Sequence, residues 1–171
     1  MKPSRLGYGD GKGEINSSIR QSHDCVIDRN TNDPVIRWIQ HQISQMANIP
    51  WEHAEGLAIV RYLPGQSYQL HHDTSEESTK KQQIKQRGLD KFGPRIKTFI
   101  CYLTDDFEGG ETAFPHIKFK TKGLKGDAIE FNNTHRDGSR DLRMVHGGLP
   151  VISGEKWIAN QWYRESPIHK L

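Results

Sequence analysis

The sequence predicts a mainly β fold of the α+β class, a jelly roll with one or more supporting helices. Two observations lead to this prediction. Short β-prone runs, each bounded by turn residues, follow one another between about residues 57 and 163. A single amphipathic helical stripe precedes them. One helix and roughly eight strands suit a jelly roll better than a parallel α/β sheet.

The helix is predicted to begin at Asp33 and Pro34, since Asp can cap a helix and Pro fits its first turn. Pro50 should stop it. Apolar residues between these limits recur at helical spacing: Val35, Ile36, Ile39, Ile43 and Met46. We expect this stripe to pack on the outside of the sheet.

The strands that follow are expected to be short. Turn signals such as Pro64-Gly65 and Thr104-Asp105-Asp106 separate them. In chain order the expected strands are 57–62, 68–72, 96–103, 111–115, 117–121, 128–131, 142–146 and 155–163.

Length and composition indicate one domain over residues 1–171, with its core at about 57–163. Residues 1–16 are expected to form a flexible arm or a loop that orders on binding. The basic stretch 74–93 is either a solvated face or a lid, and both readings stay open. Two cysteines in 171 residues argue against a disulfide framework.

The chain shows no membrane span and no signal peptide, so a cytoplasmic location and no membrane partner are expected. A net charge of +3 is too small to indicate nucleic-acid binding.

Three His-x-acid pairs occur, beginning at His53, His71 and His135. Nine His and 21 acidic residues in 171 predict about one such pair by chance, so context must choose among them. Only His71 and Asp73 lie in a plausible extended segment, residues 67–73. Residues at i and i+2 of a strand share a face, where an imidazole and a carboxylate can bind one metal ion.

A second imidazole from His146 would complete two nitrogens and one oxygen on one face of a metal, which is typical of non-haem Fe(II) oxygenases. Lys156 follows after a short strand and turn, and it can bind the distal carboxylate of a 2-oxo acid. Its neighbours predict a buried strand, where an unpaired ammonium would be costly. Tyr62 and Tyr68 flank the metal pair and either pack structurally or line the site.

Several segments, in order, resemble the prolyl 4-hydroxylase family of 2-oxoglutarate- and Fe(II)-dependent dioxygenases. The segment 62–73 is similar to the signature YxPGQxYxxHxD, and 107–115 is similar to the family's GGET-FP segment. The strand 95–103, the turn 125–128 and the closing motif 146–157 also resemble the family. Together these segments span about residues 57–163. One departure is that the chain begins close to the family's Arg-x-Ser strand, matched by Arg20-Gln21-Ser22.

This resemblance implies a double-stranded β-helix, the cupin-like form of the jelly roll. It implies Fe(II) on His71, Asp73 and His146. The residues it implies for 2-oxoglutarate are Lys156, at the C5 carboxylate, with Tyr62, Thr98 and Trp162. The resemblance also places Arg95 near the peptide groove, and Tyr68, which flanks the metal pair, is a second candidate for substrate binding.

The implied reaction consumes O2 and 2-oxoglutarate, releases succinate and CO2, and hydroxylates peptidyl proline at C4. The resemblance also implies ascorbate dependence and a proline-containing peptide or protein as partner. Two alternatives remain: hydroxylation of another peptide residue or a free amino acid, and a non-catalytic jelly-roll binding module. The sequence leaves the oligomeric state and the natural substrate open.

Overall fold

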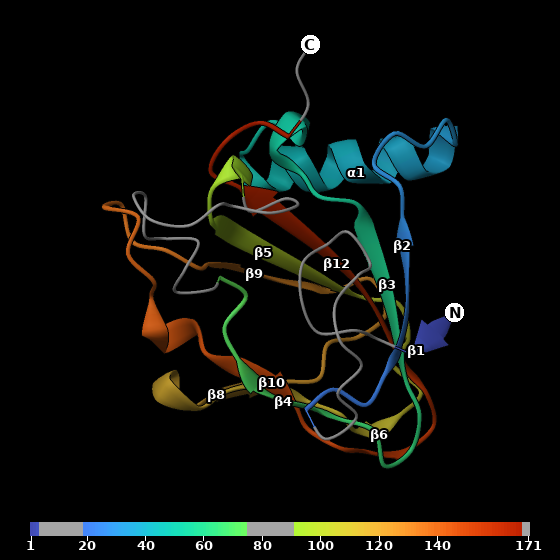
Figure 1. Ribbon diagram of the computed structural model, residues 1–171. Coiled ribbons are helices and arrows are strands. Elements are labelled where there is room, and N and C mark those ends of the chain that lie inside the picture. Colours follow the sequence, from blue (N-terminus) through green and yellow to red (C-terminus); the bar gives the residue numbers. More distant parts are fainter. Residues whose placement is uncertain (4–18, 75–90, 169–171) are drawn as a thin grey trace.

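The computed structural model describes residues 1–3, 19–74 and 91–168 (Figure 1). Nearly all of the predicted arm, 1–16, and of the predicted loop, 74–93, lies outside these residues. No helix in the described part of the chain combines the length and the apolar character that crossing a membrane requires.

The larger of the two main sheets has the strand order β1-β2-β3-β12-β5-β9, and every pairing in it is antiparallel. The central position of β12 brings the last strand of the chain between two much earlier ones. The strands are β1 Lys2–Pro3, β2 His23–Ile27, β3 Leu57–Tyr62, β12 Lys156–Arg164, β5 Arg95–Tyr102 and β9 Ala128–Asn132.

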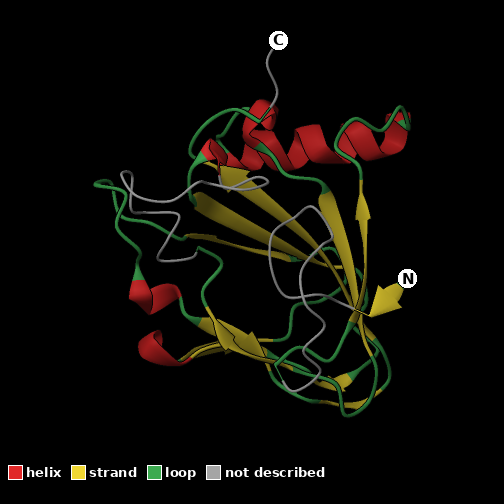
Figure 2. Cartoon of the chain, viewed as in Figure 1, coloured by secondary structure: helices red, strands yellow, loops and turns green. Residues whose placement is uncertain are grey.

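The smaller main sheet has the order β4-β10-β7-β8, and a two-stranded ribbon pairs β11 with β6, again antiparallel throughout. In Figure 2 the two main sheets lie one above the other, and α1 lies over the far side of the larger sheet. These strands are β4 Tyr68–His71, β10 His146–Gly148, β7 Thr112–Phe114, β8 Phe119–Thr121, β11 Val151–Ser153 and β6 Glu108–Gly109.

The two faces of the larger sheet bury different clusters of side chains, because neighbouring residues of a strand point to opposite sides. On β12, Ile158 belongs to the cluster between the sheets, whereas Ala159 and Tyr163 belong to the cluster under α1. The cluster between the sheets comprises Val60, Tyr62, Ile100, Tyr102, Phe107, Phe114, Phe131, Val151 and Ile158. The alternation thus directs Lys156 and Trp162 towards the smaller sheet.

The helix α1, Pro34–Ala47, begins as predicted, because the Asp33 side chain accepts hydrogen bonds from the first free N–H groups. It ends before Pro50, at Asn48, whose left-handed backbone conformation caps it.

The predicted apolar stripe of α1 is wrong at its two ends, since Val35 and Met46 are exposed. The helix is rotated so that Ser44 faces the sheet, where its hydroxyl lies 3.1 Å from the buried Tyr163 hydroxyl. Lys97 also donates to the carbonyl of Ala47. These polar contacts fit the observed rotation of the helix. The spacing of apolar residues could not predict them, because they join residues far apart in the sequence.

The strand predicted over 142–146 is also wrong. Leu142–Met144 forms a 3-10 turn, η4, because the Asp141 side chain accepts a hydrogen bond from the Arg143 N–H. A strand begins only at His146. The short strands β1, β2 and β6 were not predicted. The other predicted strands are present within a few residues of their expected limits.

Candidate metal centre

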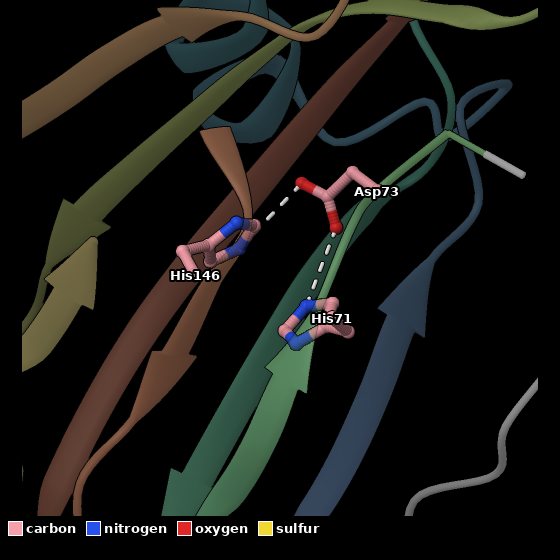
Figure 3. A group of neighbouring side chains, drawn as sticks. All are labelled: His71, Asp73 and His146. Atoms are coloured by element: carbon pink, nitrogen blue, oxygen red, sulfur yellow. Dashed lines mark ion pairs between the residues drawn. The ribbon is translucent and has the colours of Figure 1, made fainter. Parts of the chain in front are cut away.

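Three side chains, from His71, Asp73 and His146, place their ligand atoms within 4.8 Å of one another. His71 ends β4 and His146 begins β10, and the two are paired across the sheet. Nε2 of His71 lies 3.5 Å from Oδ1 of Asp73, and Nε2 of His146 lies 3.9 Å from Oδ2. Figure 3 shows the carboxylate between the two imidazoles. The arrangement offers two nitrogens and one oxygen to a single ion.

Both imidazoles are oriented by hydrogen bonds to backbone carbonyls. Nδ1 of His71 lies 2.9 Å from the carbonyl of Gln69, and Nδ1 of His146 lies 3.0 Å from that of Met144. A carbonyl only accepts, so each Nδ1 carries a proton, and Nε2 is the nitrogen with the lone pair in the neutral form of each ring. Such hydrogen bonds fix the tautomer of a metal-binding histidine.

Asp73 is held by its side chain rather than by the sheet, because β4 ends at His71. The expected extended segment therefore stops two residues short of this carboxylate. Oδ2 accepts hydrogen bonds from the Thr98 hydroxyl at 2.6 Å and from Nε1 of Trp162 at 3.1 Å. Among the described residues Oδ1 has no such donor; it lies 3.5 Å from Nε2 of His71, and a metal ion can bind between them.

The residues on either side of Asp73 are also anchored. Nδ1 of His72 accepts from the N–H of Thr74, and Nε2 of His72 lies 3.1 Å from the carbonyl of Asp141. The Thr74 hydroxyl donates to the carbonyl of Arg95. His72 therefore points away from the two metal-facing imidazoles.

The pKa shifts of His146 and Asp73 favour the protonation states that bind a cation. Burial lowers the pKa of His146 to about 4, so the ring is neutral at pH 7. Burial alone would raise the pKa of Asp73, but His146, His71 and Arg95 together hold it well below 3.8. A neutral imidazole and an ionised carboxylate are the forms that bind metal.

Lys156 lies in the same layer, on the inner face of β12. It is 2% exposed, and its Nζ donates to the carbonyl of Gly110 at 2.7 Å and to the hydroxyl of Thr112 at 3.3 Å. The rings of Tyr62 and Tyr102 flank the ammonium at 5.5 and 5.7 Å. None of the described carboxylates forms an ion pair with it, and burial lowers its pKa to about 8.

Tyr62, Tyr68 and Arg95, the remaining residues of the predicted site, lie close to Lys156, His71 and Trp162 respectively. The Tyr62 backbone pairs with that of Lys156, so the two share a face of the sheet. The ring of Tyr68 stacks on His71, with centroids 3.7 Å apart. The Arg95 guanidinium lies over the ring of Trp162 and donates two hydrogen bonds to Glu55.

Sequence reasoning missed four polar residues around the site. Thr112 lies beside Lys156, and Asn133 donates from Nδ2 to the Thr98 hydroxyl. Asn160 is on the same strand face as Lys156, and its buried Oδ1 has no hydrogen-bond partner among the described residues. Glu55 was considered only as a metal ligand. The alternation along β12 was the one signal that could have indicated Asn160.

The rival His-x-acid pairs are not part of the cluster. Nδ1 of His53 contacts the carbonyl of Arg164, and His135 lies 3.9 Å from a carboxylate oxygen of Asp141.

The sequence model of the 2OG-Fe(II) oxygenase superfamily matches residues 57–164 of the chain. The chain belongs to this superfamily. The match begins at β3 and ends with β12, so it includes His71, Asp73, His146 and Lys156.

Within the superfamily the chain is similar to prolyl 4-hydroxylases. It is 40% identical over 153 residues to a putative prolyl 4-hydroxylase of Acanthamoeba polyphaga mimivirus, covering 86% of this chain and 60% of the relative. It is 35% identical to prolyl 4-hydroxylase 1 of Arabidopsis thaliana, covering 91% and 56%. The chain thus spans less than two thirds of the length of these relatives.

A solved structure shows the same fold. The viral collagen prolyl hydroxylase of Paramecium Bursaria Chlorella virus-1, in complex with 2OG, is 32% identical and superposes with a TM-score of 0.69. The superposition covers 85% of this chain and 80% of the viral chain. The predicted jelly-roll fold is therefore confirmed.

The residues of this site fit Fe(II) and 2-oxoglutarate. Two imidazole nitrogens and one carboxylate oxygen form the donor set that non-haem Fe(II) takes. The buried Lys156 ammonium has three donors, of which two are engaged, so one is available for a carboxylate. The Thr112 hydroxyl accepts from Lys156 and Tyr102, which leaves its own proton free to be donated.

Proposed function

We propose that this chain is an Fe(II)- and 2-oxoglutarate-dependent dioxygenase that hydroxylates peptidyl proline at C4 and releases succinate and CO2. The observation that carries the proposal is the convergence of His71, Asp73 and His146 with both Nδ1 atoms bound to carbonyls. Hydrogen bonds of this kind fix the tautomer and the ring orientation of a metal-binding histidine.

Bound Fe(II) would supply the oxidation of 2-oxoglutarate and of the substrate C–H bond by O2. The protein's part is to bind and orient. Lys156 would hold the C5 carboxylate, with the Thr112 hydroxyl donating to the same group and Tyr62 covering one side. Thr98 and Trp162 would keep Asp73 turned so that Oδ1 faces the ion. The predicted contacts of Thr98 and Trp162 with 2-oxoglutarate itself stay predictions.

The substrate class rests on the relatives. Those reported above are named as prolyl 4-hydroxylases, and the viral homologue is named as a collagen prolyl hydroxylase. A proline-containing peptide is therefore the substrate we propose, with Arg95 and Tyr68 as candidate contacts at the edge of the metal site. Ascorbate dependence and a cytoplasmic location also stay predictions.

The proposal is tested by incubating the protein with Fe(II), 2-oxoglutarate and proline-rich peptides. We expect peptide-dependent release of succinate, together with a gain of one oxygen on proline by mass spectrometry. The matched control is His135→Ala, which alters another His-x-Asp pair and should retain activity, beside His71→Ala, which should have none. Oxygen gained on another residue would overturn the assignment to proline. No turnover and no metal binding would support a binding module instead.

A further inference from the structure

Glu55 is a buried carboxylate, 2% exposed, that pairs with two arginines and that the proposed function does not use. Arg95 donates from Nε and Nη2 to its two oxygens, each at 2.7 Å. Arg164 donates from Nε to Oε1 at 2.6 Å. A bidentate arginine forms two parallel hydrogen bonds with a carboxylate, which fixes the geometry of the pair. The second arginine extends this pair to a network of three charged side chains.

The backbone holds Glu55 against β12 at the level of the metal site. Its N–H donates to the carbonyl of Trp162 at 2.9 Å, and its own carbonyl accepts from the side chain of Gln161 at 2.6 Å. Ala54 forms a β-bridge with Tyr163. The carboxylate therefore has a fixed position relative to Trp162.

Arg95 connects Glu55 with Asp73 through Trp162. The guanidinium carbon lies 3.9 Å from the centre of the Trp162 ring, which is close enough for stacking. The same indole donates from Nε1 to Oδ2 of Asp73. If the Arg95 guanidinium moved, it would no longer hold the Trp162 ring in place. The Nε1–H group of that ring would then no longer be fixed towards Asp73.

The charge of Arg95 depends on both nearby carboxylates, Glu55 and Asp73. Burial lowers the pKa of Arg95, but attraction from Glu55, and then from Asp73, more than offsets this and keeps the guanidinium ionised. Arg95 is thus attracted by two carboxylates and forms its hydrogen bonds with only one of them, Glu55.

We propose that Glu55 is a positioning residue for the metal site: it holds Arg95 flat on Trp162 and keeps this arginine from pairing with Asp73. The inference rests on the proposed Fe(II) centre. Without the negative charge of Glu55, the buried guanidinium groups of Arg95 and Arg164 lose the carboxylate that they share, which is strongly unfavourable. Asp73 is then the carboxylate that attracts Arg95, and an arginine on Asp73 competes with the cation for Oδ1.

The test measures the affinity of the full chain for Mn(II), a redox-inert substitute for Fe(II), by isothermal titration calorimetry. Glu55→Gln keeps the shape of the side chain and removes its charge. We expect its affinity for Mn(II) to fall by about 10- to 100-fold, the range seen when groups that orient metal ligands are changed. Glu155→Gln is the matched control, because it removes a carboxylate that pairs with Arg61 on a strand next to β12, and its affinity should be unchanged.

A second variant separates positioning from folding. In Glu55→Gln/Arg95→Met the competing arginine is gone, and the Met side chain can still cover the ring of Trp162. This double variant should regain most of the lost affinity. If Glu55 served only the fold, the second substitution would not help, since it removes one more native contact. Thermal unfolding of each variant establishes that the protein measured is folded.

The outcomes are distinct. A folded Glu55→Gln protein with wild-type affinity for Mn(II) would overturn the inference, and so would a double variant as weak as the single one. A raised KM for the peptide with unchanged metal affinity would assign the network to substrate binding. Failure of the wild-type protein to bind Mn(II) would overturn the proposed function itself.

Discussion

His71 and His146 are Cα partners on neighbouring antiparallel strands, and their ring centroids lie 4.4 Å apart. A long stretch of sequence separates them, yet the β4–β10 ladder places them side by side. Asp73 is different, because hydrogen bonds to its side chain hold it outside the ladder. Two ligands of the candidate centre therefore depend on strand register and the third on side-chain contacts.

Asp73→Glu should abolish metal binding, although the charge is conserved. Oδ2 is held by Thr98 and Trp162, so an added methylene cannot be accommodated without moving the carboxylate away from the two imidazoles. Calorimetry with Mn(II) measures this. Glu111→Asp is the control, an equally conservative change at a carboxylate that pairs with Lys120. Wild-type affinity in Asp73→Glu would show that this side chain is not a ligand.

Lys156→Ala should weaken 2-oxoglutarate binding by at least about 30-fold and leave Mn(II) affinity unchanged, because it removes one partner of a buried charge pair. Measuring the two affinities separately distinguishes loss of the co-substrate contact from collapse of the site. Lys120→Ala removes an exposed lysine and serves as control. Unchanged affinity for 2-oxoglutarate would contradict the role of Lys156.

Affinity for 2-oxoglutarate should depend on pH through the same lysine. Burial lowers the pKa of Lys156 to about 8, so the free protein carries the ammonium below that pH and loses it above. Binding of the dianion should be constant below pH 8 and fall by up to about tenfold per pH unit above it. In Lys156→Arg this decline should disappear, because a guanidinium stays protonated throughout.

Trp162→Phe should reduce metal affinity by about tenfold, because it removes the N–H group that orients Asp73 but keeps a ring for Arg95 to stack on. The chain offers a close control in Trp157→Phe, on the same strand, since the indole of Trp157 donates to Glu155 instead. Equal affinities in both variants would mean that the Trp162 hydrogen bond is not needed.

Gly147→Ala should destabilise the protein and weaken metal binding. A Cβ at Gly147 would lie 2.8 Å from the carbonyl oxygen of Tyr68, so β10 would have to move away from β4 and take His146 with it. At Gly148 the nearest atoms are 3.8 Å away, and Gly148→Ala should be tolerated. Thermal unfolding and Mn(II) titration of the two variants provide the comparison, and equal behaviour would argue against a tight β4–β10 contact.

Local signals in the sequence were sufficient for many elements. The start of α1 was predicted because Asp33 and Pro34 act within one turn of the helix. Most strands were predicted because β-branched and aromatic residues, bounded by turns, favour extended backbone over a few residues. The strand prediction for 142–146 failed because the Asp141 side chain accepts a hydrogen bond from the Arg143 N–H, and this contact overrides a weak local preference for extended backbone.

The amino-acid sequence by itself determined the class of fold, the beginning of the helix and the residue types of a candidate Fe(II) site. These follow from periodicity, capping and donor chemistry, which act on neighbouring residues. Only the tertiary structure decided that His146 pairs with His71, that Oδ2 of Asp73 is occupied, and that Glu55 holds Arg95 against Trp162. Such contacts join distant parts of the chain, and they form only when strand register and burial are set by the whole fold.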